Sequence, residues 1–193
     1  HQTEARFARD DRCLYVAFEC RQPMDSLRAE AEKRDDERIW SDDNVQLFLD
    51  LNHDRETYVR IAVNPDGAVA DGSGYNDWRA EGRLLHQNLL PHYRDFDLKA
   101  DVECEVATER HDEGWTVELA IPWSVLGLED PPGEGKTMGL QFTRTHAASS
   151  ERSEWATTGR DYNTGAMLPY TWTKGRRLHH GVGRFGTLKL GLE

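Results

Sequence analysis

The chain has 193 residues, of which 37% are hydrophobic and 31% are charged, and this length and polarity suit one folded domain rather than a disordered segment. Its formal net charge of −11 argues against nucleic acid, whose phosphates attract clusters of Lys and Arg, and against anionic membrane surfaces. No apolar run approaches the roughly 18 residues of a transmembrane helix. An uncharged partner or a cation fits the composition better than a nucleic acid or a membrane.

Apolar and polar residues alternate at several places along the chain, which is typical of half-buried strands. The first clear alternation lies at residues 14–18. Residues 25–38 are rich in Ala, Glu, Lys and Arg with almost no apolar stripe, so we expect a short exposed helix or a loop there. Trp40 then precedes a predicted strand over residues 44–51, in which one face is continuously aliphatic.

The other face of that strand carries residue types that can hold a polar ligand. Gln46, Phe48 and Asp50 alternate with the aliphatic residues and follow Trp40 in the chain. An indole or phenyl ring can stack on a ligand while an amide or a carboxylate forms hydrogen bonds with it. The alternative is an ordinary strand with a solvated outer face and a tryptophan that covers its entrance.

The next segment predicts the second strand of a hairpin. Residues 57–63 alternate again, and Tyr58 and Arg60 are expected on the same side as Gln46 if the two strands pair. Residues 64–67, Asn-Pro-Asp-Gly, form a predicted turn, because Pro fixes φ and Gly accepts a positive φ.

The rest of the chain returns to alternation after an irregular stretch. We expect an antiparallel β-sandwich or jelly roll, an all-β fold with short helical turns and long loops, in one domain over residues 1–193. Whether this domain has a further opening strand before His1 stays open. The expected elements are a weak helix near 83–90 in the irregular stretch 71–99, a hairpin of 101–106 and 115–121, a helical turn at 122–127, a strand at 138–142, a polar loop at 145–177 with Trp155 and Trp172, and a last strand at 184–192.

Catalytic signatures are absent from the sequence, including the nucleophile elbow, the zinc-protease motif and phosphate-binding loops. Glu103, Glu105 and Glu118 lie on neighbouring strands of one predicted hairpin, where a pair for glycoside hydrolysis is one interpretation and a solvated face is the favoured one. The adjacent His179 and His180 point to opposite faces of a strand and are expected to be solvent-exposed rather than metal ligands.

Two features bear on metals and on disulfides. Asp50-x-Asn52-x-Asp54 has the alternating oxygen ligands of a calcium loop but lacks its later Gly and Glu, so a polar hairpin turn is favoured, and a structural calcium elsewhere in the fold stays open. Cys13 and Cys20 lie on one predicted strand, too far apart to bridge each other, and Cys104 can pair with at most one of them. Buried free thiols are the favoured interpretation.

Taken together, these segments resemble a family 9 carbohydrate-binding module over nearly the whole chain. The two most specific segments are Asp43-Asn44-Val45-Gln46-Leu47-Phe48-Leu49-Asp50 after Trp40, and Gly114-Trp115-Thr116-Val117-Glu118-Leu119-Ala120-Ile121-Pro122-Trp123. Weaker matches are Leu14-Tyr15-Val16, Tyr58-Val59-Arg60, Asn64-Pro65-Asp66-Gly67, Leu126-Gly127, Gly139-Leu140-Gln141-Phe142, Ser153-Glu154-Trp155 and Phe185-Gly186.

The resemblance implies non-catalytic binding of a terminal glucose- or xylose-type sugar between two Trp side chains. It assigns Trp40 to the first wall and Trp155 to the second, with Trp172 as the rival for the second wall. Gln46 stands where the family usually has Glu, and Arg152 stands where it has Asn. The resemblance implies that Gln46, Arg60 and Arg152 form hydrogen bonds with the sugar hydroxyls, and that Trp115 and Trp123 belong to the core.

This resemblance implies an oligo- or polysaccharide partner, an extracellular, cell-surface or periplasmic location, and a place in a larger multidomain protein such as a carbohydrate-active enzyme. No cofactor is required apart from the open question of structural calcium. Three alternatives remain open: a haem-binding or other redox subunit with Met138, Met167 or a His as axial ligand, a glycan-cleaving enzyme, and a structural spacer.

Overall fold

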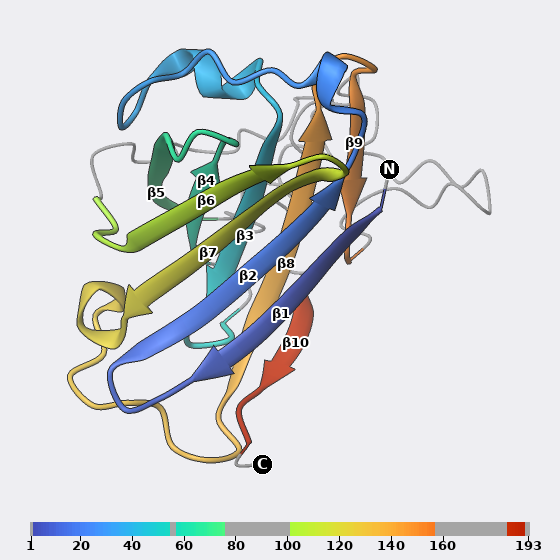
Figure 1. The fold of residues 1–193 in the computed structure, drawn as a ribbon. Helices are drawn as coiled ribbons and strands as arrows, with labels where there is room; N and C mark the ends of the chain where they lie inside the picture. The colour runs from blue at the N-terminus through green and yellow to red at the C-terminus, as the bar shows by residue number, and fades with distance from the viewer. Residues whose placement is uncertain (1, 55–56, 76–100, 157–184, 192–193) are drawn as a thin grey trace, which may run out of the picture.

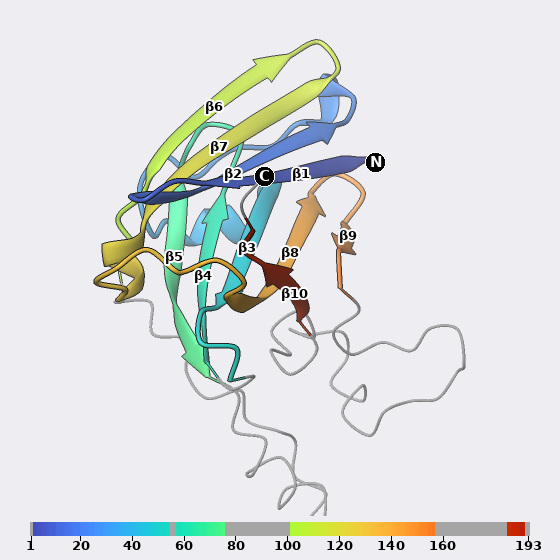
Figure 2. The ribbon, with the colours of Figure 1, turned by 90° about the horizontal axis from the view of Figure 1, so that it is seen from below.

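The computed structural model describes residues 2–54, 57–75, 101–156 and 185–191. Within these residues the chain forms two antiparallel β-sheets that face each other, and Figure 2 shows them as two layers. No described helix is long and apolar enough to cross a membrane. The prediction of an all-β sandwich with short helical turns is confirmed.

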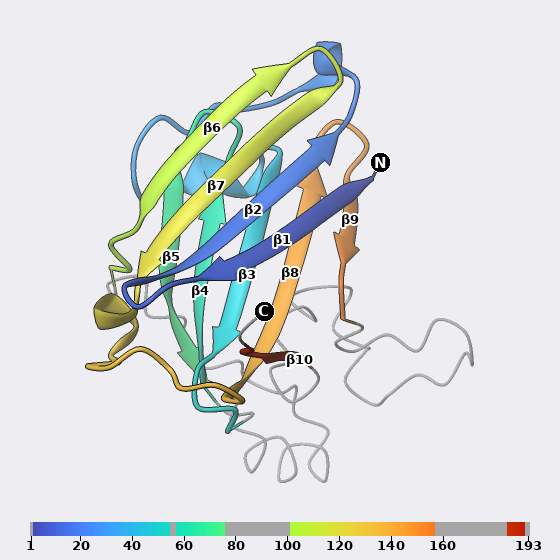
Figure 3. The same cartoon turned by 60° about the horizontal axis from the view of Figure 1, so that its bottom comes forward.

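The first sheet has four strands in the order β1-β2-β7-β6. They are β1 (Thr3–Arg9), β2 (Cys13–Arg21), β7 (Gly114–Pro122) and β6 (Glu105–His111). The predicted second hairpin is present as β6–β7, but its first strand covers Glu105–His111 instead of the expected 101–106. β2 lies beside β7 although about a hundred residues separate them in the chain (Figure 3).

The second sheet has the strand order β10-β8-β3-β4-β5, and β9 pairs with β8 as well. β9 pairs with the end of β8 that holds His146, and β10 pairs with the end that begins at Thr137, as Figure 1 shows. The strands are β3 (Asn44–Asp50), β4 (Thr57–Val63), β5 (Val69–Tyr75), β8 (Thr137–His146), β9 (Glu151–Glu154) and β10 (Gly186–Lys189).

The core lies between the two sheets and is built from the aliphatic positions of the alternating segments. Trp115 and Trp123 are 0% and 2% exposed, which confirms their predicted place in the core. Each fully buried large apolar side chain stabilises the fold by about 1.5–3 kcal/mol relative to exposure, so this cluster fixes which face of each strand is turned outward. Its members include Leu14, Val16, Phe18, Val45, Leu47, Leu49, Ile61, Val63, Val117, Leu119 and Ile121.

Residues 25–38 form no α-helix, so the loop alternative holds there, apart from two short 3-10 helices, η1 (Met24–Ser26) and η2 (Glu37–Trp40). Two buried carboxylates directly before β3, those of Asp42 and Asp43, hold this loop. Asp42 accepts hydrogen bonds from the backbone N–H groups of Glu30 and Ala31, at 2.8 and 2.9 Å. The predicted helical turn is η3 (Trp123–Leu126), which ends at Gly127 with φ 75°.

Two strands, β5 and β9, lie where the alternation of apolar and polar residues is weak in the sequence. β5 falls at the start of the stretch that looked irregular, since its Gly72 and Gly74 interrupt the pattern. A Cβ at Gly74 would overlap the ring of Tyr58, so glycine at this position leaves room for that ring. β9 lies inside the predicted polar loop and all its side chains are exposed. The predicted helix at 83–90 lies outside the described residues.

Candidate functional site

Trp40 is the last residue of η2, and three residues separate it from the start of β3. The Asp36 side chain caps this helix by accepting the Arg38 backbone N–H, and the same carboxylate pairs with the Arg38 guanidinium at 2.6 Å. Hydrogen bonds from the Arg38 side chain and backbone hold the pKa of Asp36 well below its usual range. Ile39 is buried beside Trp40. The cap and this anchor set where the indole lies.

Pairing of β3 with β4 brings the predicted polar residues to one face. Gln46 lies directly opposite Ala62, and Phe48 lies opposite Arg60. Because their neighbours on each strand point into the core, Gln46 and Arg60 share the outer face of the second sheet. Tyr58 is on the same face, as the hairpin hypothesis predicted. Gln46 and Arg60 are diagonal neighbours, a spacing that long side chains can bridge.

Arg60 also contacts Trp40 directly. Its guanidinium carbon lies 4.1 Å from the centroid of the indole ring, a cation–π arrangement. The indole packs against a small cluster of Ala31, Ile39, Ala62, Ala68 and Ala70. Arg60 is 7% exposed, whereas Trp40 is only partly buried. A ligand that approaches this face therefore meets the indole before the guanidinium.

Gln46 is 5% exposed and its amide has a defined orientation. The Nε2 group donates to Oδ1 of Asn44 at 3.0 Å, while the Oε1 atom has no hydrogen-bond partner among the described residues. A buried acceptor without a donor is unfavourable, so this atom is available to a ligand. The structure thus brings Trp40, Gln46 and Arg60 together, as the sequence analysis predicted.

An aromatic cluster that the sequence analysis did not predict adjoins these residues on the outer face. Phe48 and Tyr58 lie with their ring centroids 5.8 Å apart, and Phe185 packs on both at 5.9 and 6.0 Å. Phe185 comes from the far end of the chain, so only a tertiary contact could reveal it. The cluster lies beside the polar residues on the same face, since Phe48 is directly opposite Arg60.

Trp155 does not lie with Trp40. Its backbone N–H donates to the Phe142 carbonyl at 3.0 Å, and its ring stacks on Phe142 with centroids 5.3 Å apart and planes 13° apart. Phe142 lies opposite Leu47 on the core side of the sheet. Trp155 is therefore on the opposite face of the sheet from Gln46, at the edge, where it is 50% exposed.

Arg152 is on the same face as Asn44, because Thr145 pairs with both of them. It lies on β9, two strands away from β3, which corresponds to about 10 Å between the strands. The structure therefore places Arg152 beside the site without bringing it to Trp40. The rival second wall, Trp172, lies outside the described residues, as do Met167, His179 and His180.

Residues 1–190 match the family model described as carbohydrate family 9 binding domain-like. The chain belongs to this family. Its family thus agrees with the resemblance inferred from the two specific segments around β3 and β7. No curated protein matches the sequence.

Solved structures share the fold. A family 9 carbohydrate-binding module from Caldicellulosiruptor kristjanssonii, solved with cellotriose and separately with glucose, has 21% identity and a TM-score of 0.59, and the match covers all of this chain and 77% or 80% of that one. A candidate carbohydrate-binding protein from Bacteroides uniformis has 18% identity and a TM-score of 0.67, with 98% of this chain and 78% of that chain covered.

The Asp50-x-Asn52-x-Asp54 segment of this family 9 domain lies in the β3–β4 connection, where its carboxylates accept hydrogen bonds. Asp50 Oδ1 accepts the Asp54 backbone N–H at 3.1 Å, and Asp54 accepts both the backbone N–H and the hydroxyl of Thr57, at 2.8 and 2.9 Å. These carboxylates thus order the β3–β4 connection by accepting hydrogen bonds from the chain itself.

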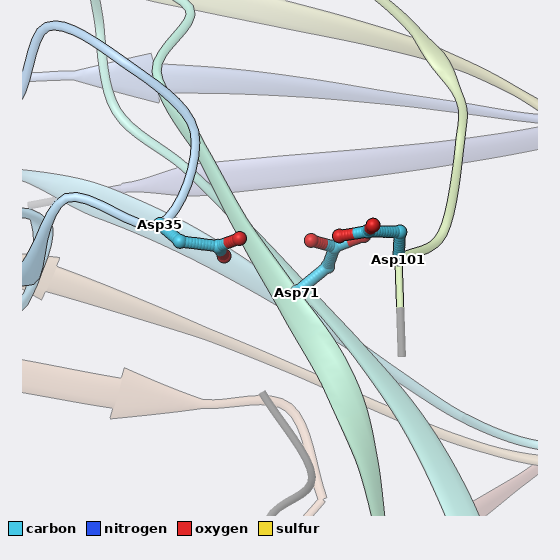
Figure 4. Close-up of side chains that lie close together, drawn as sticks. All are labelled: Asp35, Asp71 and Asp101. Atoms are coloured by element: carbon cyan, nitrogen blue, oxygen red, sulfur yellow. The ribbon is translucent and has the colours of Figure 1, made fainter. Parts of the chain in front are cut away.

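Within the described part of the chain, a different acidic group could hold a metal ion. One carboxylate oxygen from each of Asp35, Asp71 and Asp101 lies within 4.8 Å of the others, and Figure 4 shows the three side chains converging. Asp71 is fully buried, pairs with Arg34 at 2.6 Å and accepts the Val102 backbone N–H. No pattern in the sequence predicts this group, because its members lie far apart in the chain.

The residues considered for glycan cleavage and for haem binding do not come together in a site in the described part of this family 9 member. Glu105 and Glu118 are exposed on the outer face of the first sheet, as expected for a solvated row. Met138 is fully buried in the core between the sheets, away from any open surface.

All three cysteines are free, as the sequence favoured, but only Cys20 is fully buried, whereas Cys13 and Cys104 are partly buried. Burial raises the pKa of the Cys20 thiol to about 12 and that of Cys104 to about 11.

Proposed function

We propose that this chain is a non-catalytic carbohydrate-binding module that holds a glucose- or xylose-type sugar against Trp40. The observation that carries this function is the convergence of Trp40, Gln46 and Arg60 on one sheet face in a member of a carbohydrate-binding family. The axial C–H groups of a pyranose stack on an indole, and its hydroxyls need planar donors and acceptors at the ring edge. Arg60 and Gln46 supply both.

The proposed clamp has two walls, and Trp40 is the first. Since Trp155 lies on the opposite face, we assign the second wall to Trp172 rather than to Trp155. One stacked sugar ring with two or three hydrogen bonds, each worth about 1 kcal/mol, corresponds to a dissociation constant of about micromolar to millimolar. Such an affinity suits a module that keeps a larger protein on a polysaccharide chain end.

We further propose that the module acts outside the cell, at the cell surface or in the periplasm, as part of a carbohydrate-active enzyme. The net charge of −11 supports a neutral glycan in preference to an acidic polymer. The structure of the Caldicellulosiruptor kristjanssonii module was solved with cellotriose and with glucose. Gluco- and xylo-oligosaccharides are therefore the first ligands to test.

The deciding experiment measures cellotriose, glucose and xylobiose binding by isothermal titration calorimetry to the wild-type protein and to Trp40→Ala. We expect the substitution to weaken binding by at least about tenfold, since a lost stacking contact costs on the order of 1 kcal/mol and the pocket wall is lost with it. Trp155→Ala is the matched control. Equal binding by wild-type protein and Trp40→Ala would reject this site.

A further inference from the structure

The Gln46 side chain is held by a chain of hydrogen bonds that runs back into the loop before β3. Asn44 is 1% exposed, and its Nδ2 group donates to the Ile39 and Asp42 carbonyls at 2.9 and 3.0 Å. Both of these partners can only accept, so the Asn44 amide has one favourable orientation. Its Oδ1 atom must therefore face Gln46.

This orientation fixes Gln46 in turn. Because Asn44 presents an acceptor, Gln46 must turn its Nε2 group toward it, and the 3.0 Å contact joins these two atoms. The Oε1 atom then points away from Asn44. It is buried and has no donor among the described residues. Ala62, directly across on β4, offers none, and no hydrogen bond joins Gln46 to Thr143 across on β8.

We infer that Asn44 is a positioning residue that makes Gln46 Oε1 an obligate acceptor, so that the site selects a sugar carrying a free hydroxyl donor at that point. This inference rests on the proposed function and names the chemistry of one contact within it. A carboxylate at position 46 would offer more acceptor capacity, but it has no N–H to give Asn44. Glutamine is the side chain that satisfies Asn44 and the ligand hydroxyl together.

The first test needs no sugar and uses the Gln46→Glu variant. A protonated carboxyl at position 46 can donate to Asn44 Oδ1 as the amide does, whereas the ionised form faces that oxygen with an acceptor. The folded state then binds the proton more tightly than the unfolded state, whose Glu pKa is about 4.3. Stability is kept below that pH and lost as pH rises through the higher folded pKa.

We therefore expect wild-type protein and Gln46→Glu to melt at similar temperatures near pH 4, and the variant to melt about 4 °C or more lower by pH 7.5. Glu118→Gln, on the exposed face of the first sheet, is the control for adding or removing one carboxylate. A melting-temperature difference that does not change with pH would overturn the assigned amide orientation, whatever the protein binds.

The second test concerns the ligand and uses the wild-type protein, so that folding of a variant does not matter. Glucose and its monodeoxy and monodeoxyfluoro analogues are compared by calorimetry, since fluorine replaces a hydroxyl but cannot donate. At one ring position we expect the fluoro and deoxy sugars to lose affinity equally, about tenfold. A fluoro sugar that binds like glucose at every position would overturn the obligate acceptor.

The third test measures sugar binding by Gln46→Glu as a function of pH. Its affinity for glucose is expected to be about tenfold below the wild-type value at pH 7.5 and to recover toward pH 4, while the wild-type profile stays flat. Equal or tighter binding by the variant at pH 7.5 would contradict the inference. If the wild-type protein binds no sugar while the stability profile behaves as expected, the ligand part falls with the proposed function and the role of Asn44 stands.

Discussion

The guanidinium carbon of Arg60 lies 4.1 Å from the centroid of the Trp40 indole. One residue comes from β4 and the other ends a 3-10 helix before β3, so the contact joins the loop to the sheet. A guanidinium lies flat on an indole and is only weakly hydrated, which favours it over an ammonium at a stacked position. The contact therefore holds the plane of the indole against which a sugar would stack.

Arg60→Lys should weaken sugar binding while leaving the fold intact. Lysine keeps the charge but cannot stack flat or offer a planar pair of donors, so we expect a loss of about five- to tenfold in affinity for cellotriose. Calorimetry gives the affinity, and the fluorescence of Trp40, taken as the difference from Trp40→Phe, reports the indole environment. Arg6→Lys, at an exposed position on β1, is the control. Unchanged affinity and fluorescence would contradict a positioning role for Arg60.

The two candidates for the second wall can be separated by paired substitutions. Trp155→Ala removes the stacking on Phe142, so it should lower the free energy of unfolding by about 1 kcal/mol and leave sugar affinity unchanged. Trp172→Ala should leave the free energy of unfolding unchanged and abolish measurable sugar binding. Urea unfolding and calorimetry measure the two quantities. If Trp155→Ala loses sugar binding but keeps the stability of the wild-type protein, Trp155 and not Trp172 forms the second wall of the clamp.

The two-residue alternation of apolar and polar side chains predicts the β-sandwich and the positions of Gln46 and Arg60 in the site. Val45, Leu47 and Leu49 must enter the core, which sends Gln46 outward, and the same parity on the paired strand sends Arg60 to the same face. The pairing of the two strands in a hairpin is therefore enough to predict that these two residues lie close together. Trp40 follows because only three residues separate it from the start of β3.

The position of Trp155 could not be predicted in this way. β9 has the sequence Glu-Arg-Ser-Glu, and all four side chains are exposed, so no apolar residue marks which face turns inward. A shift of one residue would have placed Trp155 on the other face. The sequence does not predict β5 for a related reason, since its outward residues include Gly72 and Gly74 rather than larger side chains. Asn44 was part of a recognised segment, but its control of Gln46 depends on atoms that only the structure positions.

The two thiols with raised pKa values predict a loss of stability in alkali. Cys20 and Cys104 have folded pKa values of about 12 and about 11, against about 8.5 in an unfolded chain. From about pH 8.5 upward the unfolded state loses these protons first, so the free energy of unfolding falls, by up to about 1.4 kcal/mol per pH unit for each thiol.

This alkaline slope is measured by urea unfolding between pH 7 and pH 10.5. Cys20→Ala and Cys104→Ala, combined in one protein, should show a shallower decline than wild-type protein even though its stability at pH 7 is lower, because the core thiol leaves a cavity. Cys13→Ala is the matched control. Equal slopes in the double variant and the wild-type protein would show that other groups cause the alkaline loss.

Arg34 balances the charge of a buried carboxylate, so Arg34→Gln should destabilise the fold. The Asp71 side chain is 0% exposed and Arg34 is 36% exposed, with 2.6 Å between Nη1 and Oδ1. Without the guanidinium, Asp71 keeps the Val102 N–H but faces Asp35 and Asp101 uncompensated. Because Arg34 is partly solvated, we expect a loss of about 1–2 kcal/mol, or about 3–6 °C in melting temperature.

The same variant tests the calcium prediction. A divalent cation held by Asp35, Asp71 and Asp101 would remove their mutual repulsion, so millimolar Ca²⁺ should restore much of the melting temperature that Arg34→Gln loses, and an excess of EDTA should reverse the effect. Arg110→Gln, which breaks the exposed ion pair with Asp66, controls for general effects of salt. If Ca²⁺ changes the melting temperature of neither the variant nor the wild-type protein, the three carboxylates are not a calcium site. In that case the charge of Asp71 is compensated by Arg34.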